Sequence, residues 1–219
     1  MKPLLPIALL LLAWLPGASR AATFANGGFE LGDLSGWTAT PGLVEIVSQS
    51  EDAVGPPIGE TYLPPEGQLF AQLSTGREDG GPTTLSRTFH VSAATRISGF
   101  AAFLAYDYLP YDDEASIRIV GLQSQEMFRV RISDPAVGDF GRTPWTYFES
   151  DILEAGTYTF VAMVSDGGEV GGQSRLLLDG VALPAAAPVP EPATWSLLLA
   201  GFLMSGAWLR TCRRVVPLN

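Results

Sequence analysis

The feature that most restricts the fold is a period-two alternation of apolar and polar side chains in seven short segments between residues 68 and 183. In segment 83–91, Leu85, Phe89 and Val91 fall on one face and His90 on the other. The remaining segments are 68–74, 96–105, 116–122, 127–132, 157–164 and 175–183. This period is that of a half-buried β-strand. Segment 96–105 is apolar on both faces, which indicates a central strand.

Clusters of glycine, proline and aspartate separate these segments, for example at 80–82 and 166–168. Such clusters are typical of tight turns. No segment between residues 23 and 184 shows a convincing helical period. The sequence therefore predicts an all-β fold, a single antiparallel β-sandwich of jelly-roll type over residues 23–184.

The first 22 residues have the layout of a secretory signal peptide. Lys2 is followed by an apolar run over 4–15, and small residues fill most of 17–22. The alternative is an N-terminal membrane helix, but a span needs about 20 apolar residues and this run is shorter. We therefore expect export through the secretion translocon, with cleavage near Ala22.

The charge of the predicted sandwich argues against nucleic acid as a partner. Residues 23–184 carry eight arginines, no lysine and 22 acids, a formal charge of −14, whereas the whole chain has −10. Such a surface repels phosphate backbones and attracts divalent cations. The single cysteine, Cys212, lies outside this region. The sandwich can therefore form neither a disulfide nor a thiolate metal site.

The C-terminal region reads as a linker followed by a three-part tail. Residues 185–188 are an Ala/Pro linker. The tail begins with Val189, Pro190, Glu191 and Pro192, continues with an uncharged stretch over 193–209, and ends with Arg210, Arg213 and Arg214. The uncharged stretch is just long enough for a transmembrane helix. The arginines at 210–214 would hold its end in the cytoplasm, and the prolines would keep the preceding chain extended.

This order of motif, span and basic end resembles the PEP-CTERM sorting signal of Gram-negative bacteria, over residues 189–214. The resemblance implies that an exosortase-type membrane protease recognises the motif and removes or transfers the tail. It implies membrane anchoring before processing, and then a place at the cell surface or outside the cell. The chain differs from many such tails in continuing for five residues after Arg214. The alternative is a plain single-pass membrane anchor that is never cut.

The body carries a second resemblance, at its two ends. The stretch NGGFELGDLSGW at 26–37 and the stretch LLDGV at 177–181 resemble the opening and closing segments of galactose-binding-like jelly rolls, including carbohydrate-binding modules. The resemblance implies that the strands carrying Glu30 and Asp179 come close and that a structural calcium bridges them. Calcium is bound by six to eight oxygen atoms, many of them carboxylate. The alternative is a pair of solvated acids at strand ends.

An acidic and aromatic loop separates two of the predicted strands. Its candidate ligand-binding residues are Tyr106, Asp107, Tyr108, Tyr111, Asp112 and Asp113. Aromatic rings stack on sugar faces while carboxylates bind the hydroxyls, so the loop is a candidate site for a glycan or exopolysaccharide. Two alternatives stay open: a solvated turn, and a glycoside hydrolase that uses two opposed acids. Neighbouring acids such as Asp112 and Asp113 are poorly placed to flank a substrate.

Other catalytic chemistry finds little support in the sequence. His90, the single histidine, falls on an outward strand position, and the chain contains no G-x-S-x-G motif. The glycine-rich stretches lack the lysine and helix of a phosphate-binding loop. We therefore expect an exported, non-enzymatic module with no certain cofactor and with structural calcium as the one candidate. A carbohydrate hydrolase and a permanently anchored periplasmic protein are the alternatives.

Overall fold

A computed structural model describes residues 24–41, 43–54, 59–77, 80–168 and 172–184. All the regular secondary structure in these ranges consists of β-strands. Among the same residues, no helix has the length and apolar character that a membrane span requires. The predicted signal peptide (1–22), linker (185–188) and sorting tail (189–214) lie outside the described residues.

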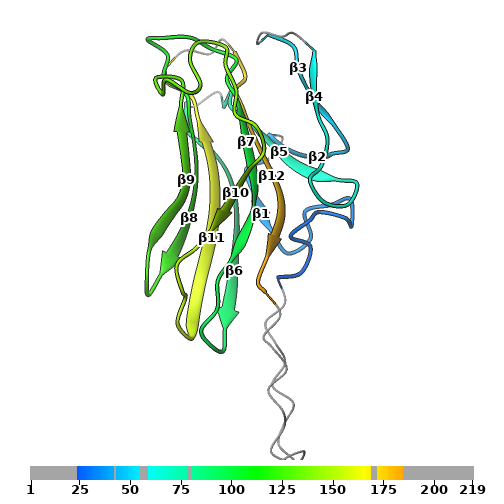
Figure 1. The fold of residues 1–219 in the computed structure, drawn as a ribbon, viewed down its shortest axis with the longest axis vertical. Coiled ribbons are helices and arrows are strands. Elements are labelled where there is room, and N and C mark those ends of the chain that lie inside the picture. The colour runs from blue at the N-terminus through cyan, green and yellow to red at the C-terminus, as the bar shows by residue number, and fades with distance from the viewer. Residues whose placement is uncertain (1–23, 42, 55–58, 78–79, 169–171, 185–219) are drawn as a thin grey trace, which may run out of the picture. The chain divides into compact units, whose positions relative to one another are not determined.

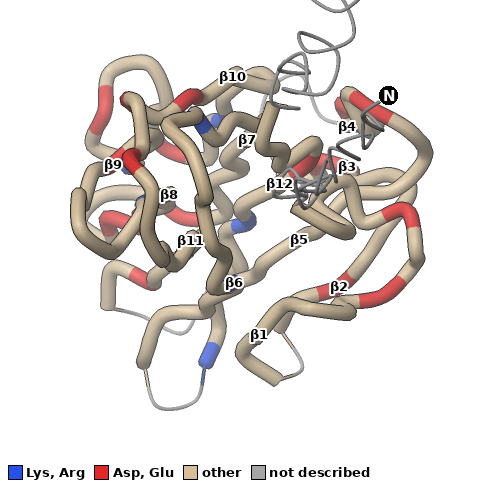
Figure 2. Tube along the Cα trace, turned by 90° about the horizontal axis from the view of Figure 1, so that it is seen from below, with Lys and Arg blue, Asp and Glu red and all other residues tan. Residues whose placement is uncertain are grey.

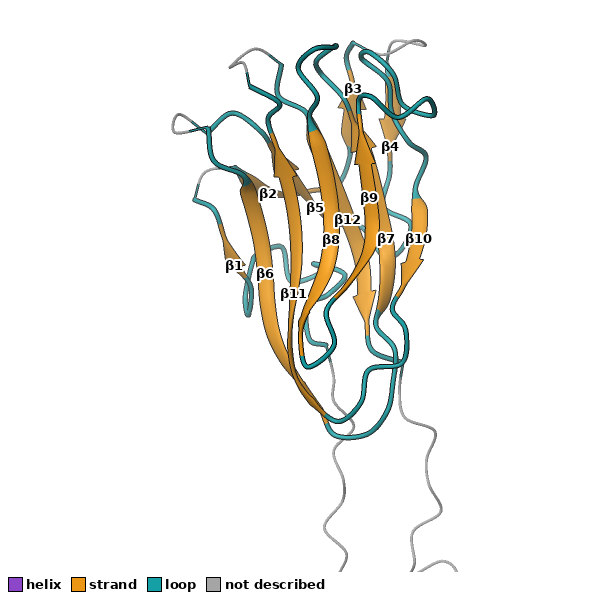
Figure 3. Cartoon of the chain, turned by 90° about the vertical axis from the view of Figure 1, so that its left-hand side faces the viewer, coloured by secondary structure: helices purple, strands orange, loops and turns teal. Residues whose placement is uncertain are grey.

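The strands form two five-stranded antiparallel sheets and one hairpin (Figures 1 and 3). The strands are β1 (Thr38–Ala39), β2 (Val44–Val47), β3 (Ser50–Asp52), β4 (Glu60–Tyr62), β5 (Phe70–Ser74), β6 (Thr83–Val91), β7 (Ser98–Leu104), β8 (Glu114–Gly121), β9 (Gln125–Arg131), β10 (Thr146–Glu149), β11 (Gly156–Ser165) and β12 (Arg175–Ala182). The first sheet has the order β1-β6-β11-β8-β9 and the second β10-β7-β12-β5-β2, while β3 and β4 pair with each other. This is the predicted all-β sandwich.

The main core lies between the two five-stranded sheets. Leu85 and Phe160 project into it from the first sheet, and Phe103 and Leu176 from the second, all four fully buried. Alternate residues of each strand share this face, as the pleat requires. Burial of a large apolar side chain contributes about 1.5–3 kcal/mol, so this shared face is what holds the sheets together.

The predicted strands agree closely with the observed ones. Strand β6 has the predicted bounds, and β5, β7, β8, β9, β11 and β12 overlap the other six segments. The expectation of a central position for 96–105 is confirmed, because β7 lies between β10 and β12. Strands β1 to β4 and β10 were not predicted, because none exceeds four residues.

A second apolar cluster covers the outer face of the second sheet. Phe70, Leu104 and Leu177 point away from the main core and pack with Tyr62 of β4 and the half-buried Trp145. The hairpin β3–β4 thus lies over this face, which explains why β7 is apolar on both sides. The outer face of the other sheet has no such cover of its own among the described strands.

The segment that precedes β1, residues 24–37, packs its aromatic side chains into the core. Phe29 is fully buried, with φ of 57°, and stacks on Trp37 at 5.3 Å between ring centroids. Trp37 donates its indole N–H to the carbonyl of Asn26 at 2.9 Å. A Cβ on Gly27 would lie 1.7 Å from a backbone oxygen of β12, so only glycine fits there. Glu30 follows in a turn, so the expectation that it lies on a strand was wrong.

Candidate functional site

Three connections meet at one end of the sandwich: 105–113 between β7 and β8, 132–145 between β9 and β10, and the described residues 166–168 and 172–174 between β11 and β12 (Figure 3). Strand β12 runs from Arg175 at this end to Ala182 at the other. The loop end is therefore opposite to the end at which the described chain leaves β12. We call it the loop end.

A group of three rings lies at the loop end, with Tyr108 exposed and Tyr111 and Phe140 half-buried. Tyr108 contacts Tyr111 at 5.5 Å and Phe140 at 5.6 Å between ring centroids. Tyr108 is 45% exposed and its neighbour Leu109 is 49% exposed. The N–H of Leu109 donates to Asp139 Oδ1 at 3.0 Å, which ties the two loops together. We refer to Tyr108, Tyr111 and Phe140 as the aromatic cluster.

Phe140 was not among the candidate residues from the sequence. It lies on a different loop from the two tyrosines, and no local pattern links the two segments. Its φ of 51° is unusual for a bulky residue. The N–H of Phe140 donates to the carbonyl of Asp107 at 2.9 Å, which brings its ring beside Tyr108. This long-range contact thus helps to complete the cluster.

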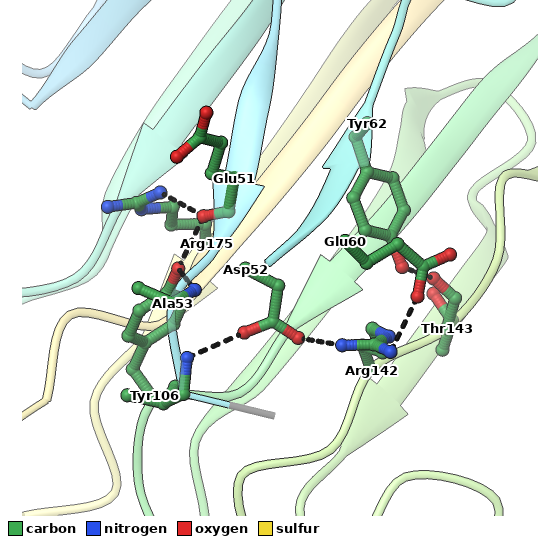
Figure 4. A network of polar contacts seen from close by, with 10 residues as sticks. Glu51, Asp52, Ala53, Glu60, Tyr62, Tyr106, Arg142, Thr143 and Arg175 are labelled. Carbon is green, nitrogen blue, oxygen red and sulfur yellow. Dashed lines mark hydrogen bonds and ion pairs between the residues drawn. The ribbon is translucent and has the colours of Figure 1, made fainter. Parts of the chain in front are cut away.

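Tyr106, predicted as a ligand-binding residue, instead supports the hairpin β3–β4 (Figure 4). Its hydroxyl donates to the carbonyl of Glu51 at 2.8 Å and accepts the N–H of Ala53 at 3.2 Å. The guanidinium of Arg175 lies 4.7 Å from the centre of its ring. Its phenol is thus engaged inside the protein rather than presented beside Tyr108.

Of the three predicted ligand-binding aspartates, one is hydrogen-bonded within the protein and the other two are buried. Asp112 accepts the N–H and the hydroxyl of Ser133, each at 2.8 Å. Asp107 is 5% exposed and Asp113 is fully buried. Because Asp113 is buried, the neighbouring pair Asp112 and Asp113 does not face a substrate together, as a hydrolase would require. Of the six predicted residues, Tyr108 and Tyr111 are the ones whose rings form the surface cluster.

An ion-pair network locks the hairpin over the second sheet (Figure 4). Arg142 pairs with the buried carboxylate of Asp52 and, at 2.6 Å, with Glu60. The Asp52 hydrogen bond is the main cause that raises the pKa of Arg142. Tyr62 donates its hydroxyl to the carbonyl of Thr143 at 2.7 Å, and burial raises the pKa of Tyr62 to about 12. The hairpin is therefore a fixed part of the sandwich.

Asp179, one of the two predicted calcium ligands, is fully buried on β12. Its carboxylate accepts the N–H of Gly180 at 2.7 Å and that of Glu66 at 3.2 Å. Burial is the main cause that raises the pKa of Asp179 to about 6, and the charges of Glu66 and Glu30 raise it further. The two backbone donors oppose this shift.

Glu30, the other predicted ligand, lies in the same region, together with Glu66, which the sequence did not suggest. Glu30 Oε1 accepts the N–H groups of Gln68 and Leu69 at 2.9 and 3.0 Å. No group of three or more His, Cys, Asp or Glu side chains in the described part of the chain is arranged to hold a metal ion. The fold brings the predicted pair of acids into one electrostatic neighbourhood, and calcium binding there stays a prediction.

Two further expectations concern the distribution of charge and the position of His90. Acidic positions outnumber basic ones along the trace (Figure 2). His90 is exposed on β6, as expected, with Nδ1 3.4 Å from the Thr157 hydroxyl. We find no role for His90 in either site.

Comparison with known proteins identifies no family for this chain. No protein-family model matches it, and no curated protein matches it either. The assignment of residues 189–214 as a sorting signal therefore stays a prediction.

Distant similarities to solved structures exist. TmCBM61, solved in complex with beta-1,4-galactotriose, is 14% identical with a TM-score of 0.47; the match covers 74% of this chain and 97% of that one. The xylan-binding CBM22-1 domain of Paenibacillus barcinonensis Xyn10C is 19% identical with a TM-score of 0.40, covering 74% and 94%. CBM28, a module specific for non-crystalline cellulose, is 13% identical with a TM-score of 0.40, covering 73% and 92%. At these values no ligand can be transferred to this chain.

Proposed function

We propose that this protein is an exported, non-enzymatic module that binds a glycan or exopolysaccharide at the loop end of its sandwich. The observation that carries the proposal is the aromatic cluster, in which the exposed ring of Tyr108 packs against the half-buried rings of Tyr111 and Phe140. Ligand sites combine apolar and aromatic surface with a few placed polar groups. The cluster supplies such an aromatic surface.

The position of the cluster supports this proposal. The rings come from two loops that hydrogen bonds join, so the surface is held in shape before a ligand arrives. The loop end is opposite to the end at which the chain leaves β12.

A glycan array probed with the full-length protein tests this function, followed by titration calorimetry on each positive glycan. Truncation of a central aromatic anchor costs about 2 kcal/mol, roughly a 30-fold loss of affinity. We expect a loss of this size for Tyr108→Ala. Tyr147→Ala is the matched control, because Tyr147 is similarly exposed (55%) but lies on β10, outside the cluster. Equal losses in both variants, or binding to no glycan, would refute the proposal.

We further propose that the tail is a sorting signal cut by an exosortase-type protease after export. The order of motif, uncharged stretch and arginines at residues 189–214 supports this, as does the completion of the sandwich by β12 at Ala182. Mass spectrometry of the surface or secreted form is the test. We expect a C-terminus near Pro190–Pro192, and an intact 193–219 in the mature protein would contradict sorting.

A further inference from the structure

Both loops that carry the aromatic cluster are anchored to the hairpin β3–β4, two positions away from a ring of the cluster. On the β7–β8 loop, Tyr106 lies two positions before Tyr108. On the β9–β10 loop, Arg142 lies two positions after Phe140. Figure 4 shows the contacts of both anchors with the hairpin. Each loop therefore places one ring in the cluster and one polar side chain against the hairpin.

The two anchors bind three consecutive residues of the hairpin. The Tyr106 hydroxyl donates to the carbonyl of Glu51 at 2.8 Å and accepts the N–H of Ala53 at 3.2 Å. Arg142 binds the residue between them, because its guanidinium pairs with the carboxylate of Asp52. Residues 51–53 thus contact both loops, one through backbone groups and the other through a side chain.

The middle residue of this segment is itself held in place. Asp52 is 1% exposed, and its Oδ1 accepts the N–H of Val54 at 3.1 Å. Glu60 lies opposite Asp52 in the register of β3 and β4, and its carboxylate is 2.6 Å from Arg142 Nη2. The guanidinium of Arg142 therefore joins both strands of the hairpin. A planar guanidinium with two carboxylate partners has a more defined position than a lysine ammonium group would have.

The two loops are also bonded directly to each other. The N–H of Phe140 donates to the carbonyl of Asp107 at 2.9 Å, and that of Leu109 donates to Asp139 Oδ1 at 3.0 Å. Asp139 is exposed, so water competes for its carboxylate and this bond contributes little by itself. The contacts with the hairpin add a second tie between the loops. A surface that is tied in two places loses less conformational freedom when a ligand binds.

We propose that Tyr106 and Arg142 are positioning residues, which set the relative position of the two loops through residues 51–53 and thereby the geometry of the aromatic cluster. Neither side chain touches the glycan. Tyr106, predicted from the sequence to bind ligand directly, acts instead through the loop that carries Tyr108. The effect on glycan affinity rests on the proposed function, whereas the effect on the loops does not.

Amide hydrogen exchange, followed by NMR on the full-length protein without ligand, tests the effect on the loops. The reporters are the N–H groups of Leu109 and Phe140, which make the bonds between the loops. Tyr106→Phe keeps the ring and removes the hydroxyl. We expect this variant to raise the exchange of both amides by about threefold to tenfold, the factor that one hydrogen bond contributes. The amide of Phe160, in the middle of β11, should change little.

Tyr158→Phe is the matched control for the loss of a tyrosine hydroxyl. The Tyr158 hydroxyl donates to the carbonyl of Glu154 at 3.0 Å, but Tyr158 lies near the start of β11, away from the loop end. We expect this variant to leave the exchange of Leu109 and Phe140 at the wild-type rate. Unchanged exchange of these two amides in Tyr106→Phe, or an equal rise in both variants, would overturn the positioning role.

Titration calorimetry with a glycan found on the array measures the effect on binding. We expect Tyr106→Phe to weaken binding by about threefold to tenfold and Tyr158→Phe to bind as the wild type does. Arg142→Lys keeps the charge but loses the planar contact with two carboxylates, so it should weaken binding and raise the exchange of the same two amides. Faster exchange with unchanged affinity would overturn the link to binding. If no glycan binds, the proposed function fails, and hydrogen exchange still decides the positioning role.

Discussion

The buried carboxylate of Asp179 should make this protein less stable as the pH rises. Burial raises the pKa of Asp179 to about 6 in the folded state, against 3.8 for an ordinary aspartate. The folded state therefore binds this proton more tightly than the unfolded chain does. Its contribution to stability is complete below about pH 4 and is lost as the pH rises through 6. With each pKa unit equal to about 1.4 kcal/mol, the loss is roughly 3 kcal/mol.

Denaturant unfolding of the full-length protein in the presence of a chelator measures this loss. The free energy of unfolding is determined between pH 4 and about pH 7 for wild type and Asp179→Asn. Other acids, Asp113 included, titrate in both proteins, so the difference between the two curves isolates Asp179. We expect the wild type to lose about 3 kcal/mol more than the variant, and Asp151→Asn, a change to an exposed aspartate on the β10–β11 loop, to follow the wild-type curve. Parallel curves for wild type and Asp179→Asn would refute the assigned pKa.

Addition of calcium extends the same experiment. A cation bound by Glu30 and Asp179 needs the ionised carboxylate, so it competes with the proton. If that predicted site binds calcium, the cation restores stability near pH 7 and has little effect near pH 4. A calcium effect that is equal in wild type and Asp179→Asn would assign the cation elsewhere in the chain.

Two further predictions concern a buried aromatic ring and a buried ion pair. Phe29→Ala should destabilise the protein by about 3–5 kcal/mol, because the ring is fully buried and stacks on Trp37; a lowered melting temperature and altered Trp fluorescence would show it, and an unchanged melting temperature would contradict it. Arg142→Met should cost about 3–5 kcal/mol, because it removes the cation that is paired with the buried carboxylate of Asp52. Arg118→Met, at an exposed position on β8, is the control and should change stability little.

The strands of the two main sheets could be predicted because alternation is a local property. Strand β6 has the predicted bounds, and β9 and β11 differ from their predicted segments by one or two residues at each end. The short hairpin β3–β4 could not be predicted in this way. Three-residue strands carry too little pattern, and this hairpin is stabilised by Arg142 and Tyr62 contacts with distant parts of the chain.

The candidate sites were predicted only in part. The resemblance implied that Glu30 and Asp179 lie close together. It did not indicate Glu66, whose N–H donates to the Asp179 carboxylate across 113 positions in the sequence. The acidic and aromatic loop was recognised from composition, which cannot separate buried acids from exposed rings. The structure makes that separation, since it buries Asp113 and exposes Tyr108.

The sequence by itself determined which segments are strands and which face of each is apolar, because a period of two depends only on neighbouring residues. The tertiary structure alone decided which outer face the hairpin covers, which ring from another loop completes the aromatic cluster, and which aspartates of the acidic loop are buried. Each of these depends on contacts between residues far apart in the chain. Such contacts follow from how the sheets pack and how the loops meet, and no local pattern encodes them.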